Sequence, residues 1–201
     1  MRVNEIFYSL QGEGAHAGMA AIFVRFSGCN LNCDFCDTTH QLYKDMTDDE
    51  IIAEIKKYPS NMVIITGGEP ALQLTSFLVA KIHEIGKTVA IETNGTRPIP
   101  PNVDWVTVSP KIPYIGNAAR LAINKAQEVK IVMDDKHSYD DPTFGITAAH
   151  YFIQPCDTGD EIRNKEIMNR CVNFIKDNPS WRLSLQIQKI LNVRCEPFSP
   201  I

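Results

Sequence analysis

The chain has 201 residues, of which 44% are hydrophobic and 22% are charged, with a formal net charge of −4. These values predict one globular domain, 1–201, and give no general electrostatic reason to expect nucleic-acid binding. No apolar run has the length of a membrane span, and the first residues lack a signal peptide's apolar core, so we expect a cytoplasmic protein. Six cysteines at this length are no disulfide framework, and cytosolic cysteine clusters more often bind metal.

Apolar runs and turn signals predict strands and helices that alternate along the chain. Strands are expected at 3–8, 20–26, 62–65, 87–93, 103–108, 128–133, 151–153 and 183–188, and helices at 48–58, 72–85, 117–125 and 161–177. A capping box opens the first helix, with Thr47 as the N-cap and Glu50 at N3. Residues 134–150 are expected to form an irregular surface excursion. This alternation indicates βαβ units and a parallel sheet.

Three closely spaced cysteines, Cys29, Cys33 and Cys36, follow the strand at 20–26. Thiolates are soft ligands for iron, and a loop with this spacing can bind one edge of a [4Fe–4S] cluster. Such a cluster normally takes four cysteines, so three leave one iron open to a substrate or cosubstrate. With His40 the same cysteines could instead form a structural zinc site, and the local pattern favours neither alternative.

Polar segments also follow the ends of later predicted strands. They are Thr66-Gly67-Gly68-Glu69-Pro70, Glu92-Thr93-Asn94-Gly95, Ser109-Pro110-Lys111 and Gln154-Pro155-Cys156-Asp157. The carboxyl ends of parallel strands meet on one face of a sheet or barrel, so we expect these segments to gather with the cysteine loop. A zinc site would explain none of them.

Arg25 lies inside the apolar strand that precedes the cysteines. It could be a charge at a strand edge that reaches solvent. We interpret it as an anion ligand instead, because the guanidinium fork matches a carboxylate and the position is next to a metal loop.

These motifs together resemble the radical S-adenosylmethionine (SAM) enzymes, whose signature is Cys-x3-Cys-x2-Cys followed by Gly-Gly-Glu-Pro after the next strand. Within that superfamily the chain resembles the 7-carboxy-7-deazaguanine synthase family. The resemblance rests on Leu10-Gln11-Gly12-Glu13-Gly14, on Arg25, on Cys36-Asp37-Thr38 and on the polar segments in their order. It implies an α/β fold, a shortened and open partial TIM barrel of about six parallel strands, because 201 residues fall short of a complete barrel.

The resemblance also implies the reaction. In that family SAM chelates the open iron, and an electron from the reduced cluster cleaves SAM to methionine and a 5′-deoxyadenosyl radical. The radical abstracts a hydrogen from 6-carboxy-5,6,7,8-tetrahydropterin, and ring contraction with loss of ammonia gives 7-carboxy-7-deazaguanine, an intermediate toward queuosine. An external flavodoxin- or ferredoxin-like donor would supply the electron, and a second copy of the chain would cover the open side of the barrel as a homodimer.

Residue roles follow from the same resemblance. Cys29, Cys33 and Cys36 would hold the cluster, and Thr38 would bind Mg²⁺ through its hydroxyl. The expected SAM contacts are Phe35, Asp37, Gly68 with Glu69 behind it, Ser109, Lys111, Gln154, Pro155, Cys156 and Asp157. The expected substrate contacts are Leu10, Gln11, Gly12, Arg25, Thr66, Glu92 and Gln188. Residues 67–68 and 154–157 could also be ordinary turns after strands, and Glu92 a structural carboxylate.

The C-terminus departs from the family pattern. The family often has a histidine where this chain has Gln188, and often ends a few residues later, whereas this chain continues to Ile201. Gln188 cannot change its charge, but it can donate and accept hydrogen bonds. Two other functions remain open from the residues: a radical SAM activase that places a glycyl radical on a partner protein, and a zinc-stabilised interaction module without catalysis.

Overall fold

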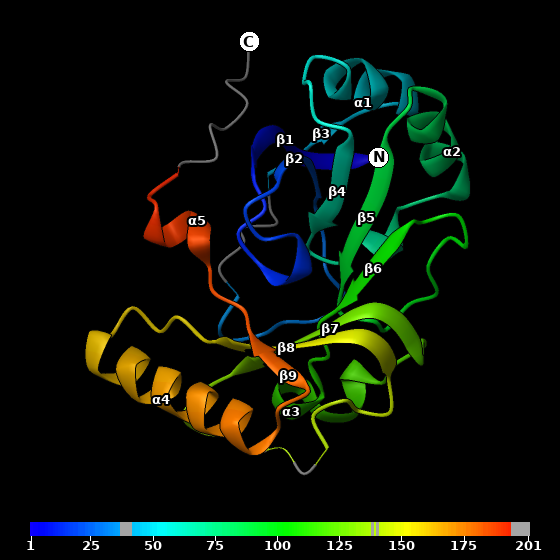
Figure 1. Cartoon of the computed structure of the whole chain (residues 1–201). Helices are drawn as coiled ribbons and strands as arrows, with labels where there is room; N and C mark the ends of the chain where they lie inside the picture. The colour runs from blue at the N-terminus through cyan, green and yellow to red at the C-terminus, as the bar shows by residue number, and fades with distance from the viewer. Residues whose placement is uncertain (37–41, 138, 140, 194–201) are drawn as a thin grey trace.

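A computed structural model describes residues 1–36, 42–137, 139 and 141–193 (Figure 1). The strands are β1 (Arg2–Leu10), β2 (Ala20–Phe26), β3 (Lys44–Asp45), β4 (Met62–Gly67), β5 (Thr88–Thr93), β6 (Trp105–Val108), β7 (Lys125–Met133), β8 (Thr147–Pro155) and β9 (Trp181–Leu183). The α-helices are α1 (Asp48–Ile55), α2 (Ser76–Glu84), α3 (Ile112–Ile115), α4 (Glu161–Asp177) and α5 (Ile187–Ile190), and 3-10 helices occupy Gly14–His16, Pro70–Leu72 and Gly116–Ala119.

Within the described residues the strands form one nine-stranded sheet in the order β3-β1-β2-β4-β5-β6-β7-β8-β9. Each neighbouring pair from β2 to β9 is parallel, whereas β1 pairs antiparallel with both β2 and β3. As far as the structure describes the chain, the sheet ends at β3 and β9 and does not close, which confirms the expected open, mostly parallel architecture. The described part contains seven parallel strands, against about six expected, because the short β9 still pairs with β8.

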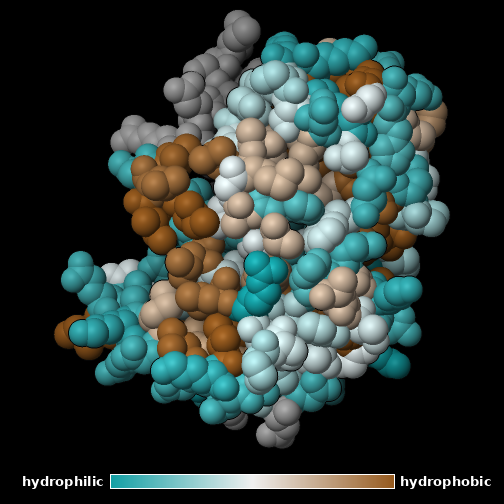
Figure 2. All heavy atoms as spheres, viewed as in Figure 1, coloured by the Kyte–Doolittle hydropathy of each residue, from teal (hydrophilic) through white to brown (hydrophobic). Residues whose placement is uncertain are grey.

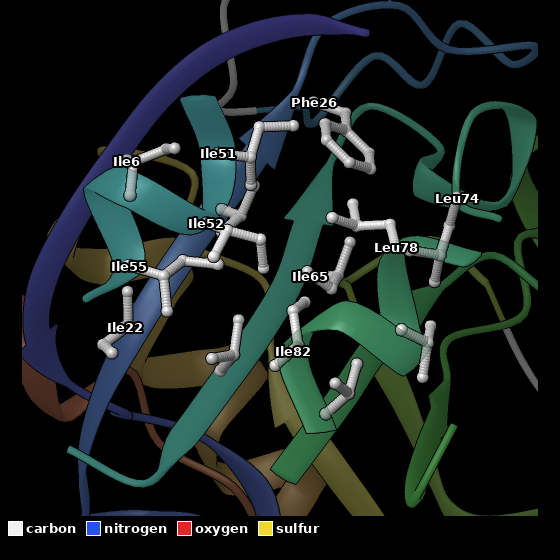
Figure 3. Packing of buried hydrophobic residues seen from close by; sticks show 14 of the residues in the cluster. Ile6, Ile22, Phe26, Ile51, Ile52, Ile55, Ile65, Leu74, Leu78 and Ile82 are labelled. Carbon is white, nitrogen blue, oxygen red and sulfur yellow. The ribbon is translucent and has the colours of Figure 1, made fainter. Parts of the chain in front are cut away.

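Isoleucines and leucines of α1 and α2 form the larger hydrophobic core against the outer face of the sheet. Figure 3 shows Ile51 and Ile55 of α1 and Ile82 of α2 pointing toward Ile65 of β4, and all four are fully buried. The capping box is confirmed: the Thr47 hydroxyl accepts a hydrogen bond from the Glu50 amide, and the Glu50 carboxylate accepts one from the Thr47 amide. Both faces of β4 are buried, which explains why its sequence is a continuous run of apolar residues.

A second core lies between α4 and strands β7 to β9. Ile167 and Cys171 of α4 are fully buried there, as is Ile153 of β8, and Trp181 of β9 is largely buried beside them. The α4 helix has the predicted bounds, and its N-cap Asp160 accepts hydrogen bonds from two amides of the first turn. In the part of the chain that the structure describes, no helix is long and apolar enough to cross a membrane.

Several sequence predictions of secondary structure are wrong in part. Residues 147–150, expected to belong to an irregular excursion, form the start of β8, and β7 begins at Lys125 instead of residue 128. The helix expected at 72–85 starts only at Ser76, where Thr75 caps it, and the expected 117–125 helix is replaced by the earlier turns at 112–119. Leu121 and Ile123 pack into the second core instead, and the Ala122 amide donates to the Gly95 carbonyl, so tertiary contacts override alanine's helix propensity. The strand expected at 183–188 ends at Leu183, and α5 follows.

Candidate functional site

The cysteine loop and the predicted polar segments meet around one cavity of about 880 Å³. The predicted residues that line it are Leu10, Gln11, Gly12, Arg25, Cys29, Cys33, Phe35, Cys36, Thr66, Gly68, Glu92, Ser109, Lys111, Gln154, Pro155, Cys156, Asp157 and Gln188. The remaining described one, Glu69, is fully buried behind the wall. Asp37, Thr38 and His40 lie outside the described residues.

The cysteine loop presents its three thiols to this cavity. Cys29 and Cys33 are half-buried and Cys36 is exposed, and the Cys36 amide donates to the Cys33 carbonyl at 3.1 Å. The Leu31 amide donates to Cys29 Sγ at 3.4 Å. Burial raises the pKa of Cys29 and of Cys33, so the free thiols favour the protonated form, and a bound metal would have to displace those protons. Three soft donors on one loop fit one side of an iron–sulfur cluster.

The Gly67-Gly68 turn holds the start of the cysteine loop directly. The Gly68 amide donates to the Phe26 carbonyl, and the Glu69 amide donates to the Gly28 carbonyl at 2.9 Å. A Cβ at Gly68 would lie 2.1 Å from the Gly28 carbonyl oxygen, which is backbone and cannot move aside cheaply. Glycine is therefore required at position 68 because two loops touch there, one residue before Cys29.

Glu69 fastens this turn to the end of β5. Its carboxylate accepts hydrogen bonds from the Thr93 hydroxyl, the Asn94 amide and the Ala71 amide, all between 2.7 and 2.9 Å. Burial raises the pKa of this carboxyl, and the three donors offset part of that cost. Glu69 thus supports the cavity wall from behind Gly68, where the sequence analysis expected it.

A further link, which no pattern in the sequence signals, joins the cysteine loop to the segment after β5. The Asn94 side-chain amide donates to Asn30 Oδ1 at 3.1 Å, and the Asn30 side-chain amide donates to the Thr96 hydroxyl at 2.8 Å. Asparagine in a turn is common, so nothing distinguishes this pair from other turn residues. The cysteine loop is consequently held by the ends of both β4 and β5.

Lys111 and Ser109 lie where β6 ends. The Lys111 ammonium donates to the Ser109 carbonyl and hydroxyl, at 2.8 and 2.6 Å. Burial lowers the pKa of Lys111 to about 8, although nearby Cys33 acts in the opposite direction. The site therefore places a partly buried amine with a reduced proton affinity beside the cysteine loop.

Glu92 connects residues that the sequence assigned to the substrate. Its carboxylate accepts hydrogen bonds from the Gln11 side-chain amide at 2.9 Å and from the Thr66 hydroxyl at 3.2 Å. Gln11 and Thr66 are themselves buried. The structure therefore brings Gln11, Thr66 and Glu92 together on the wall of the cavity.

Arg25 lies on the same side of the sheet, with a partner in β1. Its Nε donates to Glu5 Oε1 at 2.7 Å, and both side chains retain 21% of their exposure and line the cavity. Glu5 was not among the predicted residues, because a charged side chain is usually solvated. The ion pair orients the guanidinium within the cavity wall rather than toward bulk solvent.

Two largely buried charges of the cavity were not predicted. Glu13 and Lys130 form an ion pair, with side chains 14% and 8% exposed, and Lys130 Nζ lies 3.7 Å from Glu92 Oε1. Burial alone would raise the pKa of Glu13, but the Lys130 charge and its hydrogen bond lower it to about 2. Lys130 lies in a strand whose other residues are mostly apolar. Its position on the inward face of β7 is the one sequence signal for the pair, because a buried lysine needs a charged partner.

The residues around Gln188 close the open side of the cavity. Gln186 and Gln188 each donate a side-chain hydrogen bond to Glu13 Oε1, at 3.0 and 3.3 Å. Gln188 Oε1 is buried and has no hydrogen-bond partner in the described structure. A Cβ at Gly12 would lie 1.5 Å from that oxygen, so Gly12 allows the close approach of α5.

The end of β8 and the residues that follow it complete the opposite wall. Gln154 is buried and accepts a hydrogen bond from the Ser184 hydroxyl at 2.8 Å. Asp157 accepts hydrogen bonds from Lys189 and from the Gly159 amide, and the hydrogen bond from Lys189 lowers the pKa of Asp157 to about 2. Cys156 lines the cavity, whereas Cys171 is buried in α4 and packs in the second core.

Comparisons with known proteins agree with this geometry. The family model described as "Radical SAM superfamily" matches residues 23–114. A 7-carboxy-7-deazaguanine synthase from Bacteroides thetaiotaomicron is 49% identical, covering 96% of this chain and 98% of that protein, and one from Haemophilus influenzae is 36% identical, covering 95% and 93%. The crystal structure of QueE from Escherichia coli has a TM-score of 0.71 and 27% identity, covering 92% of this chain and 93% of that one.

The fold and the cysteine loop, with the matching family model, define a radical SAM enzyme, for which a [4Fe–4S] cluster and SAM are the cofactors. The chain belongs to the 7-carboxy-7-deazaguanine synthase family. This membership confirms the expected enzyme class and pathway, and it favours them over both the glycyl-radical activase and the zinc-stabilised module.

Proposed function

We propose that the protein converts 6-carboxy-5,6,7,8-tetrahydropterin to 7-carboxy-7-deazaguanine with loss of ammonia. The observation that carries the proposal is the single cavity in which the cysteine loop faces Arg25, Glu92 and Glu13. A cavity of about 880 Å³ is within the range of small-molecule sites and has room for a nucleoside-sized cosubstrate beside a bicyclic substrate. The names of the relatives support the same product.

The three loop cysteines hold the cluster in this proposal. When bound, the cluster supplies the electron that cleaves SAM at the iron left without a protein ligand. Ser109 and Lys111, with the backbone at Phe35 and Gly68, bind the polar groups of SAM. The segment 154–157 binds its adenosine side. All of these residues line the same cavity, which supports their assignment to one ligand.

The substrate occupies the part of the cavity near β1 and β5. Arg25 binds the substrate carboxylate, because a guanidinium held by Glu5 presents a fixed cation to the cavity. Gln11, Thr66 and Glu92 supply hydrogen-bond donors and acceptors for the pterin, together with the backbone of 10–12 and the side chain of Gln188. These contacts orient the substrate and exclude water around the reacting carbon.

A metal ion, an electron donor and a second copy of the chain complete the proposal. Thr38 binds Mg²⁺ through its hydroxyl, together with oxygens from substrate and water, and Asp37 contacts SAM through its backbone. The enzyme works in the cytoplasm, where thiols stay reduced, and receives its electron from a flavodoxin- or ferredoxin-like donor. Two copies form a homodimer that covers the open edge of the sheet.

An anaerobic assay tests the proposed function. Protein with a fully reconstituted cluster is incubated with a reductant, SAM, Mg²⁺ and 6-carboxy-5,6,7,8-tetrahydropterin. Liquid chromatography with mass detection should then show 7-carboxy-7-deazaguanine, and omission of Mg²⁺ should lower the rate. SAM cleavage without any deazapurine, from protein with a full cluster, would overturn the assignment of this substrate.

A further inference from the structure

The short helix α5 (Ile187–Ile190) lies over the open side of the barrel, between the end of β9 and the N-terminal strands (Figure 1). None of its residues is buried. Ile190 and Leu191 are 68% and 55% exposed. Figure 2 shows hydrophobic surface on this face in the region of α5. Little apolar burial therefore holds α5 against the rest of the chain, so its polar contacts decide how firmly it stays in place.

One set of polar contacts ties α5 to the N-terminal loop. The Ile187 amide donates to the Gly12 carbonyl at 3.2 Å, and Gln186 and Gln188 both donate to the Glu13 carboxylate. Glu13 in turn is paired with Lys130 of β7. These contacts lie at the end of the cavity where Gln11 and Glu92 also meet.

A separate contact ties α5 to the opposite wall. Lys189 Nζ donates to Asp157 Oδ2 at 2.9 Å, with side chains 42% and 40% exposed. The other oxygen of Asp157 accepts from the Gly159 amide and from the Asn164 side chain, so the loop after β8 fixes the carboxylate. The distance between residues 157 and 189 along the chain makes this a tertiary link and not a local helix contact.

We propose that Lys189 is a positioning residue, whose ion pair with Asp157 keeps α5 in place and thereby connects the two ends of the cavity. This inference rests on the proposed function, which assigns the wall at 154–157 to SAM and the Glu13 end to the pterin. SAM bound beside Asp157 favours the closed position of α5, and that position presents Gln188 to the pterin. In this proposal α5 exchanges between the position seen in the structure and an open one without these contacts, so each ligand tightens the binding of the other by the same factor.

The test measures that reciprocal effect on cluster-loaded protein under anaerobic, non-reducing conditions, where SAM is not cleaved. The dissociation constant of SAM is measured with and without saturating 6-carboxy-5,6,7,8-tetrahydropterin. In the native protein the pterin should tighten SAM binding about two- to five-fold, the range that one partly exposed ion pair supplies. Lys189→Met should abolish the shift, and Lys189→Arg, which keeps the cation, should retain it.

Two controls separate positioning from general damage. Lys57→Met removes another exposed lysine that pairs with a carboxylate, Glu54, away from the cavity, and should leave the shift unchanged. Hydrogen exchange without any ligand should show faster exchange at the amides of 187–191 in Lys189→Met than in the native protein, because α5 opens more often.

The outcomes distinguish this inference from the proposed function. A native protein without the shift, a Lys189→Met variant that keeps it, or unchanged exchange at 187–191 would overturn the positioning role. If the shift and its loss are observed but no deazapurine forms, the positioning role stands and the proposed product is wrong. If the deazapurine forms and Lys189→Met binds SAM and pterin as the native protein does, the product assignment stands and the positioning role is wrong.

Discussion

Replacing Glu13 by glutamine tests whether the buried ion pair with Lys130 organises the substrate end of the cavity. The substitution keeps the size of the side chain and removes its charge. Lys130, whose side chain is 8% exposed, would then have Glu92, 3.7 Å away, as its ion-pair partner. Removal of one partner from a buried pair typically costs about 3–5 kcal/mol, because the other charge stays buried.

The pKa of Glu13 gives a similar estimate of the free energy that the ion pair contributes to folding. Its depression from 4.5 to about 2 in the folded state corresponds to roughly 3 kcal/mol, at about 1.4 kcal/mol per pH unit. A carboxyl with a depressed pKa stabilises the folded state above its ordinary pKa of 4.5. That stability is lost as the pH falls from 4.5 toward 2. We therefore expect Glu13→Gln to lower the free energy of unfolding by about 3 kcal/mol at pH 7.

Thermal unfolding of equally cluster-loaded samples measures this cost. For a chain of this size about 1 kcal/mol shifts the Tm by roughly 2–4 °C, so Glu13→Gln should lower it by about 6–12 °C. Lys130→Met should also destabilise the protein. The double variant should lose less than the sum of the two, since neither charge is then left buried alone.

Additive effects of the two substitutions, or a Tm within about 2 °C of the native value for Glu13→Gln, would refute the reasoning. The pH dependence supplies an independent control. The native protein should lose stability between pH 4.5 and 2 more steeply than Glu13→Gln, because the variant has no carboxyl to protonate at this position.

Two further substitutions test the remaining walls of the cavity. Gly68→Ala places a Cβ 2.1 Å from the Gly28 carbonyl oxygen and should reduce iron incorporation at least several-fold by displacing the start of the cysteine loop; iron content equal to the native protein's would contradict this. Arg25→Lys replaces a fork with one ammonium and should raise the KM for the pterin by about ten-fold or more, with normal iron content. Equal losses of iron and of pterin affinity would instead make Arg25 a structural residue.

The sequence predicted the parts of the fold that depend on local pattern. The capping box at Thr47, the α4 helix and the polar segments at strand ends all follow from side-chain types at short spacing, and the structure confirms their placement. The turn at 67–70 and the cysteine loop also meet as the parallel arrangement requires.

The errors arise where distant contacts decide the conformation. The alternating pattern at 183–188 favours a strand, but Ser184 is buried and bonded to Gly14 and Gln154, and Gln186 turns to Glu13. The pairing of Glu13 with Lys130 spans more than a hundred residues, so no local spacing could reveal it. From the sequence alone, Lys130 of β7 is expected at the surface, because lysine is rarely buried without a partner. The structure shows that Glu13 of the N-terminal loop covers it.

The most direct test of the account is anaerobic electron paramagnetic resonance of the reduced protein, with iron and sulfide analysis, before and after addition of SAM. A cluster held by Cys29, Cys33 and Cys36 alone should contain about four iron and four sulfide atoms per chain, and SAM should change its spectrum by binding the open iron. Bound zinc without sulfide, or a spectrum that SAM leaves unchanged, would contradict the central claim.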